Sequence, residues 1–218
     1  MFKKFLPLFL LLVLISTIVG CEDKGSGQSA TQTGSKTDKA SEKVDDEVAV
    51  LETDMGNIVI EFFIEDAPKH VANFKKLTKE GFYDGVAFHR IIPGMIIQGG
   101  DPNSKNGPKE SWGMGQPGQQ TVPSEFNGHK HTRGIVSAAR KGNDVNSATS
   151  QFFVCISAKP DWDGQYSIFG RVVEGMEVVD IIASSPKEEG SERPAEKIVI
   201  KKASLAKRAD FRQTPQYK

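Results

Sequence analysis

The sequence predicts a mainly β domain over residues 48–206, a closed barrel or sandwich with two helices. Short runs rich in β-branched and aromatic residues recur between turns that hold Gly, Pro and Asn, which is typical of strands. Only two stretches, residues 66–81 and 174–184, carry apolar residues at helical spacing. Many short strands with few helices favour a closed β architecture, which also removes exposed strand edges.

Residues 48–62 predict a β-hairpin. Apolar residues recur at every second position over 48–53 and again over 58–62, the period of a strand with one buried face. The segment between them holds Gly56 and Asn57, two residue types that favour turns.

The first helix is predicted to follow directly. Asp66 is its expected N-cap, and Pro68 is tolerated in the first turn. Val71, Phe74 and Leu77 recur at helical spacing, and Gly81 is a natural C-terminal stop.

The remaining elements are predicted from apolar runs between turn residues. We expect a second helix over 174–184 and a polar, frayed tail over 207–218. Further strands are expected over residues 91–98, 134–139, 151–156, 167–173 and 198–200.

Residues 1–20 predict a secretory signal peptide. Two lysines precede an uncharged apolar run, and small residues follow it. The run is shorter than the roughly 20 apolar residues that span a hydrocarbon core, which disfavours a permanent transmembrane helix. Ile18–Cys21 resembles a bacterial lipoprotein processing site, which implies that Cys21 is lipidated and becomes the first residue of the mature chain.

Residues 21–47 are predicted to be a flexible linker behind this lipid anchor. The segment is rich in Gly, Ser, Thr, Gln, Lys and Asp and holds almost no large apolar residue, so it cannot offset its own ordering entropy. The expected root-mean-square distance between the ends of this linker is about 25–30 Å. We therefore expect an exported protein tethered to the bacterial envelope, at the outer face of the inner membrane or at the outer membrane, with its folded domain outside the cytoplasm.

The charge balance gives no sign of a nucleic-acid partner. The whole chain holds 28 basic and 28 acidic residues. Without residues 1–20 the balance is 26 against 28, a net charge of −2, and no basic patch with interleaved aromatics is present. Cys155 is then the only cysteine besides Cys21, and its apolar surroundings predict a buried structural thiol rather than a nucleophile.

Three motif-like fragments are weak. Residues 113–118 fit the G-x-G-x-x-G dinucleotide pattern, but Pro117 and Pro123 interrupt the helix that should follow, so a Gly-rich surface loop is favoured. His129 and His131 lack a third metal ligand at a sensible spacing, and a solvated loop is the better interpretation. No Ser-His-Asp or Cys-His arrangement stands out along the sequence.

A longer pattern is specific. Residues 88–101 read Phe-His-Arg-Ile-Ile-Pro-Gly-Met-Ile-Ile-Gln-Gly-Gly-Asp. Together with Ser150–Phe153, Asp163–Tyr166 and Phe169–Val172, they resemble the cyclophilin family of peptidyl-prolyl isomerases across nearly all of residues 48–203. The resemblance implies a closed eight-stranded antiparallel β-barrel capped by two α-helices, with a substrate groove on its outer face. It also implies isomerisation without cofactor, metal or covalent intermediate.

The resemblance implies that Arg90 is the catalytic donor to the twisting X-Pro bond. An arginine suits that role because it stays charged and offers several rigid donors. His89 is either part of this site or a packing residue. The expected substrate-binding residues are Phe88, Met95, Ile96, Gln98, Ala139, Arg140, Gln151, Phe153, Trp162 and Tyr166.

Three positions depart from the family pattern. Met95 stands where Phe is usual, so the proline pocket keeps its apolarity but loses a rigid wall. Tyr166 stands where many eukaryotic members have His. Trp162 falls one position later than the family's groove Trp. We therefore expect weak cyclosporin binding with isomerisation retained.

Two functions remain open at this point. The first is a lipid-anchored isomerase that assists the folding of exported proteins by acting on their proline-containing segments. The second keeps the fold without catalysis, as a tethered chaperone or module that binds Pro-containing segments. Arg90, Gln98 and Phe153 favour the enzyme. We expect a monomer that meets the membrane only through its anchor.

Overall fold

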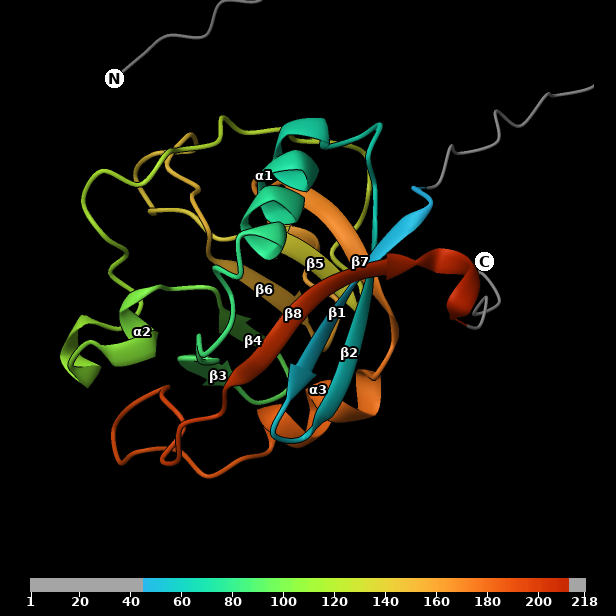
Figure 1. Ribbon diagram of the computed structural model, residues 1–218. Helices are drawn as coiled ribbons and strands as arrows, with labels where there is room; N and C mark the ends of the chain where they lie inside the picture. Colours follow the sequence, from blue (N-terminus) through green and yellow to red (C-terminus); the bar gives the residue numbers. More distant parts are fainter. Residues whose placement is uncertain (1–44, 212–218) are drawn as a thin grey trace, which may run out of the picture. The chain divides into compact units, whose positions relative to one another are not determined.

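The computed structural model describes residues 45–211. The predicted signal peptide, Cys21 and most of the linker lie outside the described residues, as does the end of the predicted tail. Eight antiparallel strands form one sheet in the order β3-β4-β6-β5-β7-β2-β1-β8 (Figure 1). The strands are β1 Glu47–Thr53, β2 Gly56–Phe62, β3 Arg90–Ile92, β4 Ile96–Gly99, β5 Ile135–Ala138, β6 Phe152–Cys155, β7 Ile168–Glu174 and β8 Ile200–Lys207.

The sheet is a curled half-barrel, so the expected closed barrel is overstated. Its edge strands β3 and β8 do not pair with each other. Instead, the segments that precede them meet: Ala87 and Val199 form an isolated bridge, and the Phe88 amide donates to the Ile198 carbonyl at 2.9 Å. Because β3 is only three residues long, these segments rather than a β3–β8 ladder bring the two edges together.

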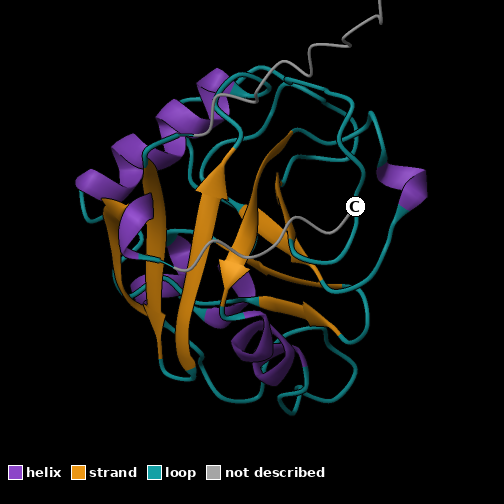
Figure 2. Cartoon of the chain, turned by 90° about the vertical axis from the view of Figure 1, so that its right-hand side faces the viewer, coloured by secondary structure: helices purple, strands orange, loops and turns teal. Residues whose placement is uncertain are grey.

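The two helices that the sequence predicted are present, and they lie at opposite ends of the sheet (Figures 1 and 2). Helix α1, Pro68–Lys79, contacts β7 and β8, whereas helix α3, Met176–Ala183, contacts β2, β3 and β4. A one-turn helix that the sequence did not predict, α2, spans Asn103–Asn106. No helix of the described residues is long and apolar enough to cross a membrane.

The start of α1 differs from the prediction. Ala67 is the N-cap residue and makes no side-chain cap, while Asp66 pairs with His129. The carboxylate of Glu125 accepts the Lys69 and His70 amides instead, at 2.9 to 3.1 Å. A carboxylate at the N-terminal end of a helix accepts hydrogen bonds from free amides and interacts favourably with the helix dipole. Glu125, which is distant in the sequence, therefore caps α1.

Two predicted strands have different bounds. The run over 91–98 is a hairpin, since Pro93 and Gly94 turn the chain between β3 and β4, and the Met95 amide donates to the Ile92 carbonyl at 2.9 Å. Gly94 has φ of +68°, which the third position of a type II turn requires. The last strand begins at Ile200 rather than at 198, and its pairing with β1 continues to Lys207.

Apolar side chains divide between the inside and the outside of the curled sheet. The main core lies inside and includes Phe74, Tyr83, Phe88 and Phe152 in edge or stacked aromatic contacts. A second cluster lies on the outer face of β4, β5, β6 and β7, around Phe153. Since residues along a strand point alternately to the two faces, the neighbours Phe152 and Phe153 serve one cluster each.

Candidate active site

Arg90, Gln98 and Phe153 form a row across three adjacent strands. Arg90 on β3 is directly opposite Gln98 on β4, and Gln98 is directly opposite Phe153 on β6. Directly opposed residues of an antiparallel sheet point to the same face. The sheet register therefore places a charged donor, an amide and an aromatic ring side by side on the outer face of the sheet, where Phe153 is buried beneath its neighbours.

A chain of hydrogen bonds holds the polar end of this row. Arg90 Nη1 donates to Gln98 Oε1 at 3.2 Å, and Gln98 Nε2 donates to Gln151 Oε1 at 3.1 Å. Gln151 Nε2 donates in turn to the Gly113 carbonyl at 3.0 Å. Every member is thereby oriented by the next one.

Arg90 has a second partner that no pattern in the sequence indicates. Its Nε donates to Glu192 Oε2 at 2.5 Å, across a separation of 102 residues. The Arg90 side chain is 43% exposed and its Nη2 meets no acceptor among the described residues. The guanidinium is thus held at two nitrogens and free at the third.

The outer cluster supplies the apolar part of the site. Phe153 meets Trp162 and Tyr166 edge-on, with ring centroids 5.5 and 5.4 Å apart. Six of the predicted substrate-binding residues belong to this cluster: Met95, Ile96, Ala139, Phe153, Trp162 and Tyr166.

Arg140 lies at the border of the same cluster. Its guanidinium stacks over the Tyr166 ring at 4.7 Å from the centroid, and its Nε donates to the Gln165 carbonyl at 3.1 Å. Arg140 Nη1 also donates to the carbonyls of Lys141 and Gly142. These contacts hold Arg140 flat against the aromatic surface rather than extended into solvent.

The prediction that His131 lies in a solvated loop is wrong. His131 is buried, its Nδ1 lies 3.1 Å from Asp163 Oδ1 and its Nε2 lies 3.1 Å from the Ser137 hydroxyl. Burial lowers the pKa of His131 despite the bond to Asp163. The Ser137–His131–Asp163 geometry is that of a Ser-His-Asp arrangement, but Ser137 has no exposed surface and cannot meet a solvent-borne substrate.

This histidine supports the aromatic surface from below. Its ring lies 6.2 Å from the rings of Phe153, Trp162 and Tyr166, and it is parallel to Phe153. One signal in the sequence could have indicated that His131 is buried: its partner Asp163 lies between Trp162 and Tyr166, two aromatic residues of the same loop.

Phe88 and His89 are both buried. Phe88 lies in the main core against Phe152, so it can support the predicted substrate surface only from beneath, and its role in binding stays a prediction. His89 is a buried packing residue, and burial lowers its pKa to about 4. Of the two interpretations for His89, the structure favours packing.

The weaker motifs carry no chemistry in the structure. Cys155 is fully buried, and burial raises the pKa of its thiol to about 12, as expected for a structural cysteine. Residues 113–118 form a loop with no strand before it and no helix after it. Within residues 45–211, no group of three or more His, Cys, Asp and Glu residues is placed to hold a metal ion.

The arrangement therefore places a fixed cation beside an apolar cluster. Such a site can grip a compact apolar ring and present N–H donors to an atom at its border.

Residues 48–205 match the family described as cyclophilin type peptidyl-prolyl cis-trans isomerase/CLD. The chain is 41% identical over 159 residues to the peptidyl-prolyl cis-trans isomerase ppi1 of Schizosaccharomyces pombe, covering 70% of this chain and 95% of that protein. It is 44% identical over 133 residues to a peptidyl-prolyl cis-trans isomerase of Synechococcus elongatus, covering 60% of this chain and 85% of that protein. It spans only 25% of the length of the peptidyl-prolyl cis-trans isomerase-like 2 of Gibberella zeae, at 44% identity.

A solved structure agrees. The cyclophilin type peptidyl-prolyl cis-trans isomerase of Cryptosporidium parvum, crystallised in the presence of the dipeptide Ala-Pro, is 32% identical, with a TM-score of 0.66. The alignment covers 73% of this chain and 98% of that one.

Proposed function

Since this chain belongs to the cyclophilin-type peptidyl-prolyl cis-trans isomerases, we propose that Arg90 is the residue that accelerates its reaction. The reaction itself is the family's: rotation about the bond between a residue and a following proline. The observation that carries the assignment is the row of Arg90, Gln98 and Phe153, which sets a charged donor beside an apolar cluster.

The chemistry of the X-Pro bond explains why a donor suffices. Resonance holds the tertiary amide planar with a barrier of about 18–20 kcal/mol, and uncatalysed exchange takes tens to hundreds of seconds. At the twisted transition state conjugation is lost, and the prolyl nitrogen gains a lone pair. A donor aimed at that nitrogen binds the twisted state better than either planar state, which is the condition for acceleration.

Arg90 meets this requirement through its free Nη2. The guanidinium stays protonated, so it donates without any proton transfer. Because Glu192 and Gln98 occupy its Nε and Nη1, little reorganisation is needed when the lone pair develops.

The outer cluster is the proposed site for the proline ring. Phe153, Met95 and Ile96 give it an apolar surface, and Trp162 packs against Phe153 at its border. We assign the residues that precede the proline to the surface around Ala139, Arg140 and Gln151, which adjoins the cluster, with Gln98 contacting the substrate backbone.

The cellular context rests on the sequence alone. Residues 1–20 and Cys21 support an exported, lipid-anchored isomerase whose substrates are Pro-containing segments of exported proteins. Labelled fatty acid should be incorporated into the wild type and not into Cys21→Ala. Equal incorporation by both proteins would rule out the anchor without touching the catalytic assignment.

The catalytic assignment is tested by cis-trans exchange of a short blocked X-Pro peptide, followed by magnetisation transfer. Arg90→Ala should lower kcat/KM by about 100-fold or more, the usual cost of a preorganised transition-state donor. Arg133→Ala is the matched control, because Arg133 pairs with Asp180 away from the row and its loss should leave exchange unchanged. Equal exchange by Arg90→Ala and the wild type would remove Arg90 from the role.

A further inference from the structure

The loop between α3 and β8 reaches the edge strand that carries Arg90. The edge strand β3 is paired with β4 on one side only. On its open side, the Ile91 amide donates to the main-chain carbonyl of Glu192 at 2.7 Å, and Arg90 Nε donates to the side chain of the same residue. One residue of the loop thus contacts β3 through both its backbone and its carboxylate.

The loop has its own internal structure. Lys187 and Pro194 form a bridge, the Glu188 amide donates to the Arg193 carbonyl at 3.0 Å, and Arg193 Nη1 pairs with Glu188 at 2.8 Å. Glu188 also pairs with Lys109 at 2.7 Å, which fastens the loop to the segment that follows α2. Glu192 therefore sits on a cross-linked turn, with its position set independently of Arg90.

We propose that Glu192 is a positioning residue for catalysis. This inference rests on the proposed function, since it acts through Arg90. An arginine side chain has several free torsions, and a single bond from Gln98 to Nη1 would leave the guanidinium plane free to swing. A second bond, in which Nε donates to Glu192, fixes the plane and leaves Nη2 free to donate to a substrate.

The pair is expected to affect rate more than stability. Both side chains are nearly half exposed, and exposed ion pairs change a folding equilibrium by about fivefold at most. Orientation of a donor toward a transition state, by contrast, acts directly on the exchange rate. The proposal therefore predicts a loss of kcat without a comparable loss of stability or of peptide affinity.

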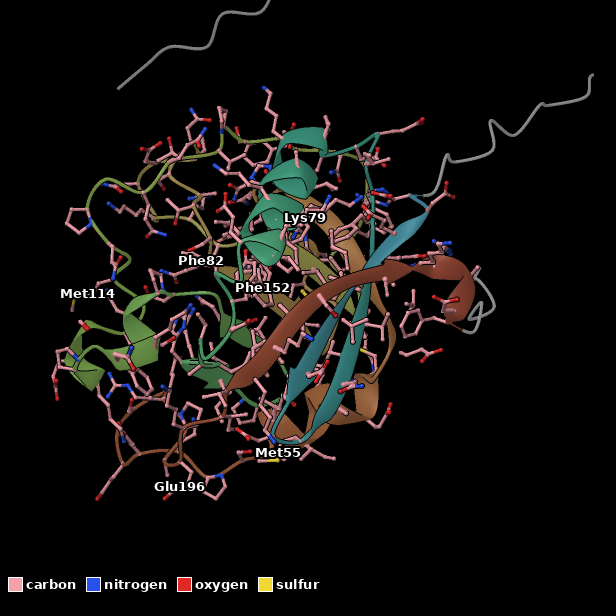
Figure 3. The ribbon with its side chains drawn as sticks, in the orientation of Figure 1. Met55, Lys79, Phe82, Met114, Phe152 and Glu196 are labelled. Atoms are coloured by element: carbon pink, nitrogen blue, oxygen red, sulfur yellow. The ribbon has the colours of Figure 1, made fainter. Side chains whose placement is uncertain are left out.

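The chain offers a matched control in the same loop. Glu196 is exposed and lies on the outer side of the loop, and it has no ion pair among the described residues (Figure 3). Glu192→Gln and Glu196→Gln change the net charge by the same amount. Only Glu192→Gln alters a side chain that contacts Arg90.

The test compares Glu192→Ala, Glu192→Gln and Glu196→Gln in the peptide exchange assay, with the peptide dissociation constant measured separately. Glu192→Ala should lower kcat about five- to tenfold, with affinity changed less than about twofold. Glu192→Gln keeps an oxygen acceptor of the same reach and should recover part of the loss. Glu196→Gln should match the wild type.

A spectroscopic readout reports the position of Arg90 itself. The Nε–H resonance of Arg90, assigned by its absence in Arg90→Lys, should be protected from solvent exchange in the wild type and in Glu196→Gln. The protection should be lost in Glu192→Ala, because the carboxylate that accepts this proton is gone.

Failure of this inference is distinguishable from failure of the proposed function. If Arg90→Ala abolishes exchange while Glu192→Ala keeps or exceeds the wild-type rate, Glu192 does not position Arg90 and only the inference falls. If Arg90→Ala itself remains active, the proposed role of Arg90 falls first. In the double variant, Glu192→Ala should cause no loss beyond that of Arg90→Ala, since its effect passes through that side chain.

Discussion

Trp162 packs edge-on against Phe153, with ring centroids 5.5 Å apart and ring planes at 81°. The geometry is that of a favourable aromatic pair, in which the edge of one ring meets the face of the other. Trp162 therefore supports the ring proposed to grip the proline, although it falls one position later in the sequence than the tryptophan usual in this family.

Loss of this support should weaken substrate binding. An aromatic pair of this kind contributes about 0.5–1.5 kcal/mol beyond its buried area, so Trp162→Ala should raise KM for an X-Pro peptide roughly three- to tenfold. Because Trp162 does not contact Arg90, kcat should change little. Phe126→Ala, which removes an exposed aromatic ring outside the cluster, is the control for general effects. An unchanged KM in Trp162→Ala would remove this residue from the pocket.

The same residue should determine the response to cyclosporin. The indole N–H of Trp162 meets no acceptor among residues 45–211, and its position along the chain is shifted from that of the family's groove tryptophan. We expect inhibition weaker than that of eukaryotic members. The double substitution Asp161→Trp with Trp162→Leu restores the usual Trp-Leu-Asp-Gly order and should tighten it. The measurement is a cyclosporin inhibition titration of the wild type and the double variant. Wild-type inhibition as tight as that of eukaryotic members would contradict the prediction.

Gln98 should matter through Arg90 rather than through stability. It accepts from Arg90 Nη1 and donates to Gln151, so Gln98→Ala breaks the hydrogen-bond chain at its centre. We expect kcat/KM to fall about tenfold, as a partly released donor loses its alignment. The exposed Gln120→Ala should be neutral in the same exchange assay. A neutral Gln98→Ala would show that Glu192 alone suffices to hold Arg90.

The local elements of this fold follow from local patterns in the sequence. Helix α1 and the β1–β2 hairpin each have a periodic pattern, so the sequence predicts that they exist, although their ends differ. Gly56 and Asn57, predicted in the turn, are the first residues of β2 and pair with Thr53 and Glu52. The hairpin at Pro93 and Gly94 is also a local signal, since Pro followed by Gly is typical of a type II turn. We interpreted that stretch as one strand because its apolar residues continue on both sides of the turn.

Only part of the candidate site could be predicted from the sequence. The long motif around Arg90 indicates the residues, but their alignment in a row depends on the register of three strands separated by up to 63 positions. Glu192 carries no signal of its own, because nothing in the sequence separates it from Glu188, Glu189 or Glu196. Its pairing arises from tertiary structure alone.

The same holds for two other polar residues. Glu125 caps a helix that lies 55 residues earlier in the chain, so no local cap motif could indicate it. The sequence around His131 is typical of a loop, so it does not predict that His131 is buried. The burial arises from contacts with Asp163 and the aromatic cluster.

The buried histidines should make stability depend on pH. Burial lowers the pKa of His89 to about 4, whereas its value in the unfolded chain is about 6.5. Between these two values the unfolded state binds more protons, so the free energy of unfolding rises with pH and falls on acidification. From pH 7 to pH 5 the loss due to His89 alone is about 2 kcal/mol. Burial also lowers the pKa values of His70 and His131, which adds to the loss in the same direction.

His89→Phe isolates the share of this residue, since phenylalanine keeps a ring and does not titrate. Urea unfolding at pH 5, 6, 7 and 8 should give a shallower fall below pH 7 in the variant than in the wild type. Between pH 7 and 8 the His89 imidazole is mostly neutral in both the folded and the unfolded chain, so any difference from repacking the ring should be nearly constant there. Parallel profiles from pH 8 to pH 5 would mean that His89 titrates alike in the folded and unfolded chains, against its burial beside Arg90.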